Sequence, residues 1–310
     1  MTYTAFRGMK PFSQLLFTSF IILAVFLVFQ LVAGIVAIPV FGFSRVTSML
    51  DMVDMSDPVT VAMLKYFQVI QGIGLFIVPA LLAAWLLFGD VGETLYLKQP
   101  LKATPALLVI LLILSINPFM NFLGAVNSEM HLPGWLEGLE NWMRQAEETA
   151  TEITEAFLKV NGPGGLLFNL FMIALLPALG EELLFRGVIQ KILTAMTRNH
   201  HWGIWLAAAL FSALHMQFFG FVPRLLLGAL FGYLLVWSGS LWMPILAHFI
   251  NNAGAVTLMY LADKGIVSRS VEEFGTDTEY WIYALPSMII GLAIMWTIRH
   301  HLVIRRKEII

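Results

Sequence analysis

The sequence predicts an all-α integral membrane protein, a bundle of about eight transmembrane helices with an acidic amphipathic helical loop between spans three and four. Hydrophobic residues make up 59% of the 310-residue chain and charged residues only 12%, whereas soluble chains carry about 25% charged residues. The apolar residues form long runs with few or no charges, and a helix needs about 20 such residues to cross a bilayer. No cleavage site of small residues follows the first run, so we interpret it as a true span rather than a signal peptide.

Eight runs have the length and hydropathy expected of spans. The first three cover 12–43, 66–88 and 103–126, the fourth begins near Gly165, and the last four cover 202–219, 221–237, 241–261 and 281–298. The fifth and sixth runs are short and almost contiguous, so their boundaries are the least distinct. The segment from Leu136 to Val160 is too polar to span a membrane, and its apolar residues alternate with glutamates as in an amphipathic helix or helical pair. We interpret it as a solvated cap on the outer face.

The basic residues indicate an orientation. An even number of spans places both termini on one side of the membrane, and the segments on that side hold Arg7, Lys10, Lys98, Lys102, Lys191, Arg198, Arg299, Arg305, Arg306 and Lys307. Loops on the other side also hold basic residues, but these lie among many acidic ones. Because cytoplasmic loops carry an excess of Lys and Arg, both termini are expected in the cytoplasm. The compact loops and the lack of a targeting signal favour a bacterial inner (plasma) membrane.

Composition also excludes several kinds of chemistry. The chain has no cysteine, which rules out a thiol nucleophile, a cysteine-ligated zinc and any disulfide. A net charge of -2 argues against nucleic acid as a partner. No HExxH motif and no GxSxG motif is present, which disfavours a zincin-type and a serine-type protease.

Charged residues inside a predicted span are the strongest functional signal, because burying them in a bilayer is unfavourable. Glu181 and Glu182 are adjacent, so their side chains project about 100° apart on a helix. Glu182 precedes Arg186 by four residues, the favourable order for an ion pair, and we expect these two to pair with each other. Glu181 is then left without a local partner, as befits a general base. A salt bridge at the end of a span is the alternative interpretation.

Two further sets of polar residues lie in other predicted spans. His215 follows Phe211 in the fifth span, and His248 precedes Asn252 by four residues in the seventh. Each set alone could be a hydrogen bond between helices. If the fourth helix continues to Arg198, however, helical rise places Glu181 and His215 about 24–27 Å along their helices from the shared turn. The three sets are then expected to converge at one level of the bilayer.

Taken in order, these motifs resemble those of the CPBP family, which contains type II CAAX prenyl endopeptidases and bacterial bacteriocin-processing or immunity proteins. The resemblance rests on EExxxR at Glu181, FxxxH at Phe211 and HxxxN at His248, and it covers about Gly165 to Leu261, under a third of the chain. The predicted spans and this matched region together divide the chain into an N-terminal three-span region (1–126), an extracytoplasmic amphipathic loop (127–163), a catalytic core (164–262), and a last span with a basic cytoplasmic tail (263–310).

What the resemblance implies is hydrolysis of a peptide bond by an activated water inside the membrane, in a membrane-associated, prenylated or other peptide substrate. Glu181 and His215 would activate the water, and His248 and Asn252 would stabilise the oxyanion. Glu182 and Arg186 would support them. The expected partners are a peptide or lipidated-protein substrate and membrane lipid, while the oligomeric state stays open.

The resemblance leaves the cofactor open between a glutamate-dependent mechanism and a metalloprotease. We expect no tightly bound cofactor. If a divalent metal such as zinc is used, its ligands would be Glu181, His215 and His248, with a fourth position for water.

Two other functions are compatible with the same residues. A non-catalytic peptide-binding or bacteriocin-immunity scaffold would keep the fold without the reaction. A proton-coupled transporter would use the polar residues as a relay, but it should show repeated broken helices in both halves. The polar residues here all lie in the second half, which disfavours the transporter.

Overall fold

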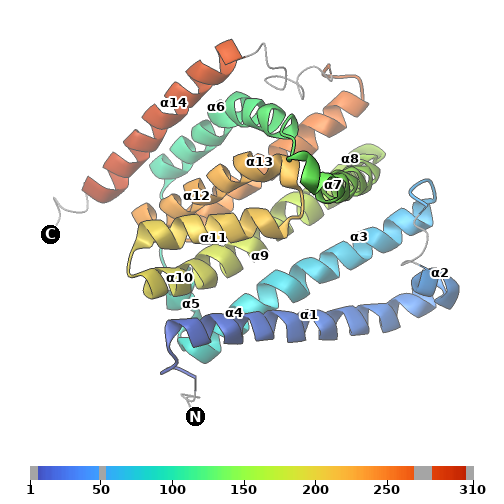
Figure 1. Ribbon diagram of the computed structural model, residues 1–310, viewed down its shortest axis with the longest axis horizontal. Coiled ribbons are helices and arrows are strands. Elements are labelled where there is room, and N and C mark those ends of the chain that lie inside the picture. The colour runs from blue at the N-terminus through green and yellow to red at the C-terminus, as the bar shows by residue number, and fades with distance from the viewer. Residues whose placement is uncertain (1–5, 49–53, 269–280, 305–310) are drawn as a thin grey trace.

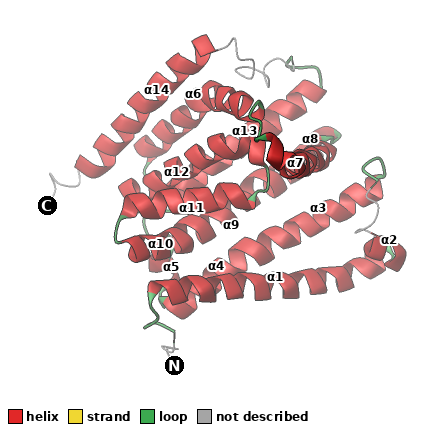
Figure 2. Cartoon of the chain, in the orientation of Figure 1, coloured by secondary structure: helices red, strands yellow, loops and turns green. Residues whose placement is uncertain are grey.

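The computed structural model describes residues 6–48, 54–268 and 281–304, and within them the regular structure is helical, with no strand (Figures 1 and 2). The α-helices are α1 (Pro11–Phe41), α2 (Phe43–Ser48), α3 (Pro58–Gly72), α4 (Val78–Leu87), α5 (Val91–Thr94), α6 (Ala103–Ser128), α7 (Glu137–Leu158), α8 (Gly162–Asn169), α9 (Leu176–Glu181), α10 (Gln190–Thr197), α11 (His200–Leu214), α12 (Phe221–Ser238), α13 (Trp242–Asp263) and α14 (Trp281–Arg299). Short 3₁₀ segments are η2 (Gly134–Leu136) and η5 (Phe218–Gly220), and π-helical segments are η1 (Ile73–Ile77), η3 (Leu170–Leu175), η4 (Glu182–Ile189) and η8 (His300–Ile304).

The predicted class, an all-α membrane bundle, is confirmed. Seven helices of the described chain are long and apolar enough to cross a bilayer, and one of them is the continuous run Gly162–Thr197. Large apolar side chains cover the outside of the bundle, as on α1, where Phe20 and Leu31 are about two-thirds exposed, at 65% and 66%. Such surfaces are stable only against lipid, so the chain is an integral membrane protein. The basic residues Arg305, Arg306 and Lys307 lie outside the described residues.

The predicted count of eight full spans is corrected in one place. The fifth span was expected over 202–219, but α11 ends at Leu214 after 15 residues, about 22 Å of helix, which is less than the roughly 30 Å hydrocarbon core. Met216 adopts a left-handed backbone with φ of 56°, so the helix cannot continue. The chain therefore turns back through η5 into α12.

The fourth span is one helix whose hydrogen-bond pattern changes along its length. It runs from Gly162 to Thr197, so the expectation that it continues past Arg186 is confirmed. Two π-helical segments, η3 and η4, flank α9 and its last residue Glu181. Pro177 follows η3 and has no N–H to donate to the carbonyl of Ile173 four residues earlier. π-helical segments of this kind are frequent at functional sites.

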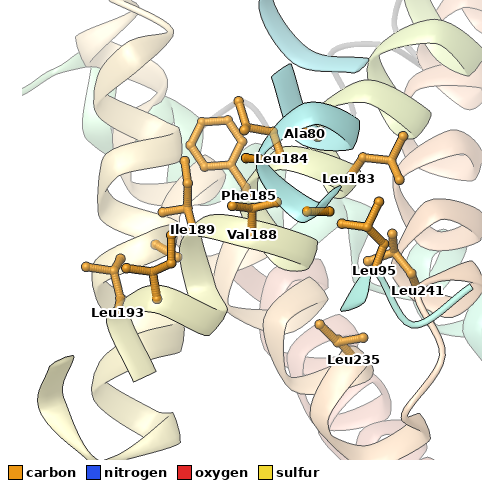
Figure 3. Close-up of a cluster of buried hydrophobic side chains, with 14 of the residues drawn as sticks. Ala80, Leu95, Leu183, Leu184, Phe185, Val188, Ile189, Leu193, Leu235 and Leu241 are labelled. Atoms are coloured by element: carbon orange, nitrogen blue, oxygen red, sulfur yellow. The ribbon is translucent and has the colours of Figure 1, made fainter. Parts of the chain in front are cut away.

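Neighbouring helices hold the fourth span in place. In Figure 1, α1 lies beside α3 and α4, α6 lies beside α14, and α11 packs on both α10 and α12, while α13 packs on η3. Figure 3 shows that Leu183, Leu184 and Phe185, which directly follow Glu182, lie in a hydrophobic cluster with Leu95 and other apolar residues from several elements. Because this cluster fixes η4, the polar residues just before and within η4, from Glu181 to Arg186, are held in one orientation.

The packing between α10, α11 and α12 depends on small residues. The hydrogen atom of Gly203 on α11 faces Thr194 so closely that a Cβ there would lie 2.0 Å from Thr194 Oγ1. On α12, Gly228 and Gly232 are four residues apart and face Arg186 and Gln190, which are also four apart on the fourth span. Small residues at this spacing let membrane helices approach closely enough for backbone contacts.

Candidate active site

The structure brings together acidic and imidazole groups from three helices at the end of α9. Glu181 Oε2 lies 3.9 Å from His215 Nε2 and 3.9 Å from His248 Nε2. Glu181 is the last residue of α9, His215 follows the end of α11, and His248 is in the first half of α13. Glu181 and His248 are buried, and the side chain of His215 is 30% exposed. Three predicted site residues therefore share one small region.

His215 is oriented by its own helix. Its Nδ1 lies 2.7 Å from the carbonyl oxygen of Phe211 one turn earlier, and a carbonyl can only accept, so Nδ1 carries the proton. The neutral ring then presents the lone pair of Nε2 toward Glu181. The ring of Phe211 packs edge-on against the imidazole, with centroids 4.7 Å apart. The FxxxH spacing thus supplies both the hydrogen bond and the packing that hold this imidazole.

Glu182 joins two neighbours through a single oxygen. Its Oε1 accepts from Arg186 Nη1 at 2.8 Å and lies 2.9 Å from His248 Nδ1. The predicted pair between Glu182 and Arg186 is therefore present, with side-chain exposures of 0% and 1%. The contact with His248 was not foreseen from the sequence, because it joins residues 66 positions apart.

Arg186 is surrounded by groups that suit a buried guanidinium. Besides Glu182, its Nη2 donates to the carbonyl of Gly228 at 3.0 Å, and its charge lies over the rings of Phe211 at 4.6 Å and Phe231 at 5.4 Å. Phe231 also stacks on His248, with ring centroids 5.3 Å apart. The sequence analysis did not predict these contacts of Arg186, although the Gly228-x-x-x-Gly232 spacing indicates a close helix contact.

Asn252 makes its hydrogen bonds to residues outside the Glu181 cluster. Its Nδ2 donates to the carbonyl of Ile173 at 3.2 Å, the carbonyl to which Pro177 cannot donate. Asn251 Nδ2 donates to Asn252 Oδ1 at 3.1 Å. The residue therefore ties α13 to η3, one turn of α13 beyond His248. The proline four residues after Ile173 was the signal in the sequence for this contact.

The two carboxylates hold unsatisfied oxygens. Glu181 Oε2 and Glu182 Oε2 are buried and accept no hydrogen bond. At 3.9 Å, the distance from Glu181 Oε2 to either imidazole is too long for a direct hydrogen bond, and a polar separation of this size is commonly bridged by water. The Nε2 atoms of two imidazoles thus lie around one buried carboxylate oxygen that accepts no hydrogen bond from the protein.

A zinc ion would draw on this donor set, since two histidines and a glutamate are ligands of catalytic zinc sites. Donors around a tetrahedral zinc lie about 3.4 Å apart at bond lengths of about 2.1 Å, and the two separations from Glu181 Oε2 are wider. Within the described residues, no three His, Cys, Asp or Glu side chains are placed to hold a metal ion. The site as described does not have the spacing of a metal centre, and we derive no step through one.

Comparison with known proteins agrees with the motifs. Residues 163–254 match the model of the family described as "Type II CAAX prenyl endopeptidase Rce1-like", so the resemblance seen in the three motifs is confirmed over this segment. The match contains Glu181, His215, His248 and Asn252. It also makes the chain similar, in this segment, to membrane-embedded proteases.

One curated relative is similar to part of the chain. The Bacillus subtilis (strain 168) protein named "Uncharacterized protein YpbD" is 35% identical over 89 residues, which are 27% of this chain and 42% of YpbD. The matched part of the chain thus spans less than half of that relative's length. No solved structure matches the chain.

Proposed function

We propose that this protein is an intramembrane endopeptidase that hydrolyses a peptide bond with a water activated by Glu181 and His215. The observation that supports this most directly is the 3.9 Å separation between Glu181 Oε2 and His215 Nε2. One water that donates to both atoms fits between them. Such a water is oriented and is deprotonated as it attacks a carbonyl carbon, the role of a general base.

The developing oxyanion requires donors on the opposite side of the substrate carbonyl. We assign this role to His248 and to the second N–H of the Asn252 amide. Glu182 accepts from His248 Nδ1 and holds the ring, so that His248 Nε2, when protonated, becomes the donor. Arg186 donates to Glu182 and holds it in place, as a positioning residue. The proton taken from water passes from Glu181 or His215 to the leaving amine.

We propose that the substrate is a lipidated or otherwise membrane-associated peptide, because Glu181 and His248 lie on helices long and apolar enough to cross a bilayer. We propose that both termini lie in the cytoplasm, on the basis of the basic loops, and that the membrane is a bacterial inner membrane, on the basis of the compact loops. The water is activated without a tightly bound metal.

The test is cleavage of a fluorogenic farnesyl-cysteine peptide by the purified protein in nanodiscs. Wild type should cleave it, while Glu181→Gln and His215→Asn each lower kcat/KM by about 10²–10⁴-fold. The matched control is His200→Asn, which changes an exposed imidazole at the start of α11. Wild-type turnover by either site variant ends the mechanism. Tight binding of the peptide without cleavage by the wild type would instead identify a scaffold.

A further inference from the structure

The short loop that follows His215 has a backbone that needs external support. Met216 has a φ of 56°, a left-handed conformation that is unfavourable for a residue with a long side chain. Backbone of this kind persists only where surrounding groups hold it. The loop, residues 216–220, directly follows His215, so the contacts that hold the loop also fix the backbone from which the His215 side chain extends.

Side chains from three separate elements bind the backbone of this loop. Asn127, in the last turn of α6, donates to the carbonyl of Phe218 at 3.3 Å and accepts from the N–H of Val222 at 2.8 Å. Arg224 on α12 donates to the carbonyl of Gln217 at 3.1 Å and to its side chain at 2.8 Å. The first two anchors therefore come from spanning helices next to the loop.

The third anchor comes from α7, the acidic helix between the spans. Glu147 Oε2 accepts from the N–H of Phe219 at 3.0 Å. On the same helix, the guanidinium of Arg144 lies 4.3 Å from the centre of the Phe219 ring, and the ring of Trp142 lies 5.5 Å from that of Phe218. α7 thus supplies a carboxylate, a cation and an aromatic ring that contact this loop.

These contacts connect α7 to the loop that follows His215. We propose that Glu147 is a positioning residue, which holds the 216–220 loop through the Phe219 N–H and thereby holds the imidazole of His215 toward Glu181. The proposal rests on the proposed function for its catalytic consequence, but the contact itself does not. The hydrogen bond needs an acceptor at position 147 and not a charge, so glutamine serves there and alanine does not.

The test combines hydrogen–deuterium exchange with kinetics on the full chain in nanodiscs, using the farnesyl-cysteine peptide as probe. In Glu147→Ala, amide exchange over 215–222 should speed up at least about tenfold, and kcat should fall about 10- to 100-fold, as expected for a displaced catalytic group, with KM unchanged. Glu147→Gln should restore both. Glu148→Ala, at the exposed neighbouring position on α7, is the matched control and should match wild type.

Trp142→Ala provides a second variant if Glu147→Ala does not fold, since it loosens the same loop through Phe218 while leaving Glu147 in place; faster exchange over 215–222 is expected. Unchanged exchange in both variants would overturn the proposal, as would a Glu147→Gln variant as impaired as Glu147→Ala. If Glu147→Ala shows faster exchange but the wild type has no peptidase activity, the loop contact is supported and the proposed function is contradicted.

Discussion

His248 and Glu182, 66 residues apart in the chain, are joined by a 2.9 Å contact between Nδ1 and Oε1. The same oxygen accepts from Arg186 at 2.8 Å. The Glu182–Arg186 pair, which helical spacing predicts, therefore also links α13 to the fourth span and orients the imidazole of His248.

The first prediction concerns removal of one charge from this buried pair. Glu182→Gln and Arg186→Met should each destabilise the protein by about 3–5 kcal/mol, because an unpaired charge stays buried. The double variant should lose less stability than the sum of the two single losses, since no unpaired charge is left buried. Thermal unfolding in detergent measures this. Strict additivity of the two losses would show that the charges do not interact.

The second prediction concerns close packing of α10 and α11. A Cβ at Gly203 would lie 2.0 Å from Thr194 Oγ1 and 2.9 Å from two Thr194 backbone atoms, so Gly203→Ala should destabilise the protein by about 1–3 kcal/mol through overpacking. Gly124→Ala on α6 is the matched control, because nothing lies within 4 Å of its added Cβ. Equal unfolding temperatures for the two variants would contradict the packing.

The third prediction concerns acid and the start of α7. The backbone N–H of Leu132, followed by Arg144 and His131, lowers the pKa of Glu140 from its ordinary value of 4.5 to about 2. Because the folded pKa is lowered, the stabilisation is complete above about pH 4.5 and is lost as pH falls toward about 2. Glu140→Gln should unfold at a lower temperature than wild type at about pH 6, and the difference should shrink by about pH 3.

A difference between Glu140→Gln and wild type that does not change with pH would show that the ionised carboxylate is not the stabilising species. Glu148→Gln, at an exposed position of the same helix, is the control for a general effect of removing one acid.

The fourth prediction concerns metal. Dialysis against 1,10-phenanthroline and EDTA should leave kcat within about twofold of the untreated enzyme, because in the proposed mechanism Glu181 and His215 activate the water without a metal. Metal analysis of the active preparation should find less than one zinc per chain. Loss of activity that is restored by added zinc, and by no other divalent ion, would replace this mechanism with a metal-dependent one.

The fifth prediction concerns orientation, and the absence of cysteine from the chain makes it easy to test. In intact spheroplasts, Glu148→Cys on α7 should react with a membrane-impermeant maleimide, while His200→Cys at the start of α11 should react only after lysis. The opposite pattern would invert the proposed topology. Both positions are exposed, so poor reactivity in lysed cells would be the sign of a misfolded variant.

The membrane-bundle fold and much of the site could be predicted from the sequence, because the relevant physics is local. An uncharged run of about 20 residues has few stable alternatives to a spanning helix, since every backbone group must be paired in lipid. The Glu182–Arg186 pair follows from helical spacing. The approach of Glu181 and His215 follows from counting residues on either side of one turn, once the fourth helix is taken to continue.

Only the tertiary structure decided the rest, because those contacts join segments whose separation in sequence carries no period. The link from His248 to Glu182, the bond from Asn252 to the carbonyl that Pro177 leaves without a donor, and the hold of Glu147 on Phe219 each cross between elements. The turn of the chain at Met216 likewise depends on how α6, α7 and α12 surround it. Packing between helices, and not helical periodicity, sets these positions.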